Sequence, residues 1–196
     1  MKTKNYKEKY SKKVDKKPIK NKRLIDWTWI STVTALAFLI SVLFSFFSEA
    51  ITNNANSILA TIIILLFIGL GIIFDMVGIS ITVADIKTFN SMATKQVKGA
   101  NLAVKLIKNS EKASSFCNDV IGDICGIVSG SAGVALAAIL SATYDLKMFT
   151  TTLIITAIIA ALTIGGKAIG KATAINKSTV ILFEFSKIVS CFYKGK

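Results

Sequence analysis

The sequence contains no histidine, a single proline and three cysteines among its 196 residues. Without histidine, Ser–His and Cys–His nucleophilic sites are excluded, and most zinc, copper and haem sites lose a principal ligand. Cys117 and Cys125 lie eight residues apart on one predicted helix, about 12 Å along its axis, which is too far for a disulfide. We therefore expect reduced cysteines, no enzyme activity and no bound cofactor.

Acidic residues are also scarce, since 11 of them oppose 24 lysines and arginines and the net charge is +13. Eleven of the basic residues fall within positions 1–23, where only Glu8 and Asp15 oppose them. We predict that residues 1–23 form a disordered, basic cytoplasmic tail, because they have too little apolar surface to offset the entropy of ordering. This tail adjoins an apolar run directly, so we expect it to face the lipid bilayer rather than nucleic acid.

Apolar residues are in excess, at 53% of the chain, and indicate an integral membrane protein. We predict an all-α fold with four transmembrane helices, at residues 24–47 and at about 58–84, 115–142 and 148–168. The first span is longer than the apolar core of a signal peptide, typically about 7–15 residues, so an uncleaved anchor is favoured over a cleaved leader.

Charge placement sets the predicted topology. Residues 49–57 contain no lysine or arginine and are expected outside the cell, whereas six lysines fall at about 87–113, and Lys177 and Lys187 fall within 172–193. The apolar residues of both stretches recur at helical spacing, which predicts juxtamembrane amphipathic helices. The prediction is a multi-pass protein of the cell membrane with both termini in the cytoplasm.

Polar residues inside the predicted spans are the candidate functional residues. The inner half of the second span carries Asp75 with Gly78, Ser80 and Thr82, and the third span carries Asp119, Asp123 and Ser129. A carboxylate at the centre of a lipid-embedded helix costs roughly 2.5–3.5 kcal/mol, so these acids must face protein, water or a cation. Glycine recurs every fourth residue at Gly122, Gly126 and Gly130, which predicts a seam for close helix packing.

Four short segments, in this order and spacing, resemble the transmembrane domain of the CNNM/CorB/CorC magnesium transporter family. They are Asp75-Met76-Val77-Gly78, the basic stretch at 101–107, Gly122-Asp123, and Gly166-Lys167-Ala168-Ile169-Gly170-Lys171. The family has Ser-Gly-x-Glu/Asn, a basic helix, Gly-Asn-x-x-x-Asn and Gly-Glu-x-x-Pro-Lys at these places. The resemblance covers about 64–192, within a family-like domain at 55–196, and leaves the tail and the first span as additions.

The resemblance implies Mg²⁺ transport and a homodimer. Mg²⁺ prefers oxygen ligands and keeps several waters, and Asp75 and Asp123 supply suitable carboxylates, with Asp119 and Ser80 as further candidates. The residues expected to shape the site or its helix packing are Gly78, Gly122, Gly126, Gly130, Gly166, Lys167 and Gly170. The CBS domains that follow in many family members are expected on a partner chain.

Several family positions are changed, and they leave other functions open. Lys167 stands where the family has glutamate, and Asp75, Gly78, Asp123, Ile127 and Gly170 also depart from the family pattern. If Lys167 pairs with Asp75 or Asp123, the chain is better read as a non-transporting membrane subunit or scaffold with a decayed ion site. A cavity lined by both acids favours transport. A holin-like pore former is the third alternative. There are also plainer interpretations: the glycine spacing serves only helix packing, and the acids are simply solvated.

Overall fold

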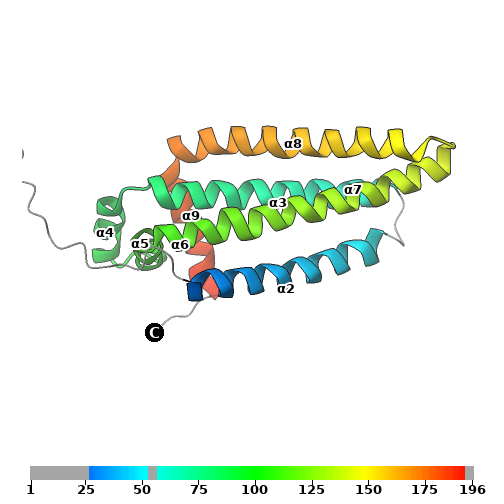
Figure 1. Ribbon diagram of the computed structural model, residues 1–196. Coiled ribbons are helices and arrows are strands. Elements are labelled where there is room, and N and C mark those ends of the chain that lie inside the picture. Colours follow the sequence, from blue (N-terminus) through cyan, green and yellow to red (C-terminus); the bar gives the residue numbers. More distant parts are fainter. Residues whose placement is uncertain (1–26, 53–56, 193–196) are drawn as a thin grey trace, which may run out of the picture. The chain divides into compact units, whose positions relative to one another are not determined.

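The computed structural model describes residues 27–52 and 57–192, and these residues form helices without strands (Figure 1). The predicted basic tail at 1–23 lies outside the described residues. The chain divides into two compact units, residues 1–32 and 33–196. Of the first unit only the beginning of α2 (Trp27–Thr52) is described, and the fold below is that of the second unit.

Three helical stretches are long and apolar enough to cross a membrane. They are α3 (Ser57–Val83), the continuous stretch Ser110–Tyr144 and α8 (Met148–Asn176). The middle one consists of α6 (Ser110–Ser115), η1 (Phe116–Gly122) and α7 (Asp123–Tyr144). Helices of this kind satisfy their backbone hydrogen bonds internally, as lipid requires. The prediction of an all-helical, multi-pass membrane protein is confirmed at this level, and α2 adds a shorter apolar stretch, Trp27–Leu43.

Helix α3 packs against both α7 and α8, and the three run side by side (Figure 1). One half of their contact is an apolar cluster of Ala60, Ile64, Ile68, Ala132, Leu136 and Ile159. Gly133 of α7 leaves the space that the Ile159 side chain of α8 fills. Lipid provides little hydrophobic driving force between helices, so close van der Waals packing of this kind holds the spans together.

Three shorter helices gather at the end of the bundle where α3 finishes: α4 (Ile86–Thr94), α5 (Ala100–Lys108) and α9 (Ser178–Phe192). Asp85 caps α4, since its carboxylate accepts a hydrogen bond of 3.0 Å from the backbone N–H of Lys87. Phe89 of α4 and Leu182 of α9 are fully buried in one core with Val77 and Ile81 of α3. This core fixes the short helices to the spans.

The short helices expected at about 87–113 are α4, α5 and α6, with a break between α4 and α5 where Gln96 and Gly99 both adopt positive φ. The structure changes one predicted boundary. The fourth predicted span was expected to end near residue 168, but α8 continues to Asn176, so residues 172–176 belong to it and not to the last helix. Gly166 and Gly170 lie within this longer helix and receive the Ile72 and Met76 side chains of α3.

Gly99→Ala is expected to destabilise the protein. Gly99 has a φ of 90°, and an added Cβ would lie 2.9 Å from the backbone nitrogen of Lys187 in α9. Backbone strain and this contact together predict a loss of about 2 kcal/mol in the free energy of unfolding. Denaturant titration of the full chain in detergent measures it. The control is Gly69→Ala, where an added Cβ meets nothing within 4 Å; equal stability of the two variants would contradict the assignment.

Candidate functional site

The third span contains a π-helical segment, η1, at Phe116–Gly122. π-helical turns are rare and are frequently found at functional sites, and their wider turn moves side chains out of α-helical register. The sequence analysis did not predict it. A weak signal was present, since all seven residues of this segment belong to the poorer helix formers.

Helix α3 approaches η1 closely at two glycines. A Cβ on Gly71 would lie 3.2 Å from Cys125 Cβ and 3.4 Å from the Gly122 carbonyl oxygen. The space beside Gly78 is filled by the side-chain amide of Asn118. The Oδ1 atom of Asn118 is buried there and has no hydrogen-bond partner. Asn118 is therefore a site residue that was missed in the sequence, and it lies within the π-helical segment.

Charged residues from three helices meet at this level of the bundle. The Lys167 ammonium of α8 donates to Asp123 Oδ1 of α7 over 3.4 Å. Asp75 of α3 lies within electrostatic range of both, and also of Asp119 and Lys171. We call these five residues the charge cluster. It unites Asp75, Asp119, Asp123 and Lys167, which the sequence analysis singled out.

With every group ionised, the three carboxylates and two ammonium groups of the charge cluster sum to one net negative charge. Its parts differ in exposure: the Lys167 side chain is 26% exposed and that of Asp123 is 65% exposed. In a membrane span, a carboxylate this exposed requires water, protein or a cation against it. The pair with Lys167 satisfies only part of that requirement.

The charge cluster is not a preformed metal cage. Among residues 27–52 and 57–192, no three Asp, Glu, Cys or His side chains converge closely enough to hold a metal ion. A hydrated Mg²⁺ needs only one or two carboxylates and keeps its remaining waters, so Asp75 and Asp123 suit that mode of binding. Asn118 Oδ1, which packs against Gly78 of α3, is a buried acceptor without a partner among the described residues.

The candidate hydroxyl groups lie elsewhere. Ser80 is fully buried and its Oγ has no partner. It follows Gly78 by two residues, which in an α-helix is a rotation of about 200°, so its side chain points away from the face that meets η1. Thr82 donates to the Ile79 carbonyl at 2.7 Å, and Ser129 donates to the Gly126 carbonyl at 2.9 Å. These two hydroxyls are used within their own helices, and the acids are left as the main candidate ligands.

The glycines predicted to shape the site divide into two groups. Gly166 and Gly170 receive the Ile72 and Met76 side chains of α3, which holds Lys167 next to η1. Gly126 and Gly130, in contrast, have no atom within 4 Å of an added Cβ. The seam of every fourth residue in the third span is thus open over most of its length within this chain.

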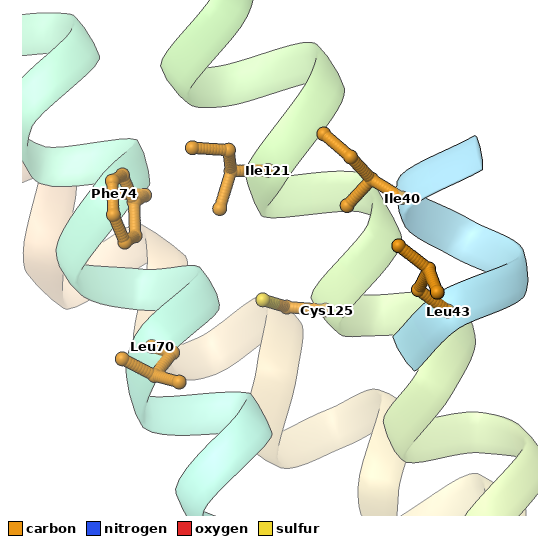
Figure 2. Close-up of a pocket in the computed structure, with 6 residues that line it drawn as sticks. All are labelled: Ile40, Leu43, Leu70, Phe74, Ile121 and Cys125. Atoms are coloured by element: carbon orange, nitrogen blue, oxygen red, sulfur yellow. The ribbon is translucent and has the colours of Figure 1, made fainter. Parts of the chain in front are cut away.

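A separate cavity of about 290 Å³ lies between α2, α3 and the third span (Figure 2). Its lining is Ile40, Leu43, Leu70, Phe74, Ile121 and Cys125, without any member of the charge cluster. All three cysteines are free thiols, as expected, with Cys117 and Cys125 buried. Because its lining is apolar, this cavity suits a hydrocarbon chain rather than an ion. Without an occupant it is a packing defect.

Comparison of the chain with protein-family models, with curated proteins and with solved structures finds no significant match. The resemblance to the CNNM/CorB/CorC family therefore rests on the ordered segments of the sequence itself.

Gly78→Ala tests the contact between α3 and η1. The added methyl group must displace the buried Asn118 amide, so we expect a loss of about 1–3 kcal/mol in the free energy of unfolding. Denaturant titration in detergent measures this loss. Gly126→Ala is the control on an open face of the third span.

The double variant Gly78→Ala/Asn118→Ala gives the specific result. If the Asn118 amide is what the methyl group displaces, its removal restores most of the lost stability. Additive losses in the double variant would show that the two residues are not in contact.

Proposed function

We propose that this chain is a CNNM/CorB-like membrane protein that transports divalent cations, with Mg²⁺ as substrate, across the cell membrane. The observation that carries the proposal is the charge cluster, in which Asp123 of the third span pairs with Lys167 and lies within electrostatic range of Asp75 of α3. Acidic residues in membrane spans are rare and commonly mark ion or substrate pathways. The ordered sequence resemblance supports the same function independently.

Asp75 and Asp123 bind the hydrated ion in this proposal, and Asn118 Oδ1 accepts a hydrogen bond from one of its waters. Asp75 lies eight residues before the end of α3 at Val83, and Lys167 lies nine residues before the end of α8 at Asn176. These separations correspond to about 12–14 Å along each helix axis. An ion from the cytoplasm has to travel this far to reach the site.

The proposed topology has four spans, with α2 crossing the membrane before α3. Both termini then lie in the cytoplasm, because the positive-inside rule assigns basic segments such as 1–23 and the lysines near α5 and α9 to that side. In α5 the residues Ala100, Ala103 and Val104 are buried while Lys105 and Lys108 are exposed, as suits an amphipathic helix at the headgroups.

A second candidate function is a non-transporting membrane subunit or scaffold. The observation that favours it is the ion pair from Lys167 to Asp123, which neutralises one of the two proposed ligands. In that function the chain assembles with a partner chain that carries regulatory CBS domains. The two functions differ in whether the purified chain alone moves Mg²⁺.

A homodimer is part of the proposal, and the exposed side of α7 suits its interface. Asp123, Ile127 and Gly130 lie on one face of this helix at helical spacing. Ile127 is 61% exposed, and no atom of the described residues lies within 4 Å of a Cβ placed on Gly130. A second copy on this face would remove the exposed Asp123 carboxylate from lipid.

Asp123→Asn and Asp75→Asn are each expected to reduce Mg²⁺ flux at least about tenfold, because each removes one carboxylate ligand. Purified chain in proteoliposomes with an enclosed Mg²⁺ indicator measures the initial rate. Asp145→Asn is the control, since Asp145 lies in the turn between α7 and α8 and its positive φ of 52° also suits asparagine.

Unchanged flux in both site variants would remove Asp75 and Asp123 from the site. Flux at the level of empty liposomes in the unaltered chain would favour the scaffold function.

Ile127→Cys tests the dimer face in a background without the native cysteines. Oxidation in membranes is expected to give a disulfide-linked dimer, measured by non-reducing gel electrophoresis, because the two copies of residue 127 meet near the symmetry axis. Ile169→Cys on α8 is the control: this position is 73% exposed, slightly more than Ile127 at 61%. Equal cross-linking at both positions would indicate random collision instead of a specific interface.

A further inference from the structure

We infer that Lys167 is a tethered counter-ion, which occupies the cation site in the absence of an ion and which an arriving dication displaces from Asp123. This inference rests on the proposed function and adds to it how the same site is regulated. It follows from the position of the ammonium group, from its freedom to move and from the charge that remains when it leaves.

The position of the ammonium group is set by a glycine. Lys167 Nζ lies 3.8 Å from the place that a Cβ of Gly122 would take, and 3.4 Å from Asp123 Oδ1. It therefore lies over bare η1 backbone beside one proposed ligand, and within electrostatic range of the other, Asp75. A dication held by both carboxylates would occupy this same region.

The contact between Lys167 and Asp123 is loose. A charge-assisted hydrogen bond from nitrogen to a carboxylate is typically about 2.7–2.9 Å long, and this one is 3.4 Å. The Lys167 side chain is 26% exposed within the single chain. The flexible four-carbon stem of lysine allows the ammonium to withdraw toward the headgroups while the stem stays on apolar surface.

Withdrawal of Lys167 changes the charge of the site to match its substrate. With Lys167 in place, the charge cluster has one net negative charge. Without it, the three carboxylates and Lys171 leave two, which is the complement of Mg²⁺. The empty site is thus partly neutralised by the protein itself, and the ion must compete with a covalently attached cation.

Lys167→Met and Lys167→Gln test the inference in the full chain purified in detergent. Removal of the competing ammonium is expected to lower the Mg²⁺ concentration that gives half-maximal thermal stabilisation by about tenfold. Lys177→Met is the matched control, because it removes the same charge at the C-terminal end of α8, ten residues from Lys167. The control is expected to leave the half-maximal concentration unchanged.

A second measurement follows Lys167 in the unaltered chain and needs no variant to fold. Amine acylation read by mass spectrometry is expected to label Lys167 at least about twofold faster when Mg²⁺ is added, relative to Lys177, because the ammonium leaves Asp123. Ca²⁺ and K⁺ at matched ionic strength separate ion binding from charge screening.

The outcomes separate this inference from the proposed function. If Mg²⁺ stabilises the unaltered chain and both Lys167 variants at the same concentration, Lys167 is not a counter-ion, while Mg²⁺ binding stands. If Mg²⁺ stabilises neither the unaltered chain nor the variants, the inference and the proposed transport site are overturned together. Labelling of Lys167 that Mg²⁺ does not change also overturns the displacement.

Discussion

The close approach of α3 to both η1 and α8 is the constraint on which the rest of the structure depends. It needs positions without side chains. Gly71 and Gly78 of α3 supply them where α3 meets η1, and Gly166 and Gly170 of α8 supply them where α8 meets α3. Spans in lipid gain little from hydrophobic burial against each other. Close contact stabilises the bundle instead through dispersion attraction and through electrostatic interactions over short distances. The same glycines thereby bring Asp75, Asp123 and Lys167 to one level.

Charge placement and packing in this bundle are therefore two effects of one arrangement. A carboxylate in a span is costly in lipid, and the cost falls when other spans bring a cation or water to it. The apolar half of the bundle, around Ile64 and Leu136, contains no such groups and packs as an ordinary helix contact. The charged half lies toward the end that α5 and α9 cover, where lysines are concentrated.

Hydropathy was enough to predict the helical class and three spans, because crossing a membrane dictates length and composition. The polar residues within those spans were also visible, since Asp75, Asp123 and Lys167 interrupt apolar runs. The π-helical turn and Asn118 were not predicted, because helix register depends on which neighbour a residue meets. Tertiary contact likewise decides that Gly78 and Gly170 are packed while Gly126 and Gly130 stay open. The end of α8 was misjudged for the same reason.

A site that alternates between filled and empty faces a physical difficulty when it is empty. Two carboxylates at one level of a membrane span repel each other once no cation separates them. A fixed positive charge would stabilise the empty state but would also prevent binding, whereas a charge on a long, partly exposed side chain stabilises it reversibly. Lys167 has this property, because its ammonium lies over Gly122 and makes only a loose contact of 3.4 Å with Asp123 Oδ1. A lysine at this position is thus compatible with a working ion pathway as well as with a decayed ion site. The two differ in whether the Lys167 ammonium leaves Asp123 when an ion arrives.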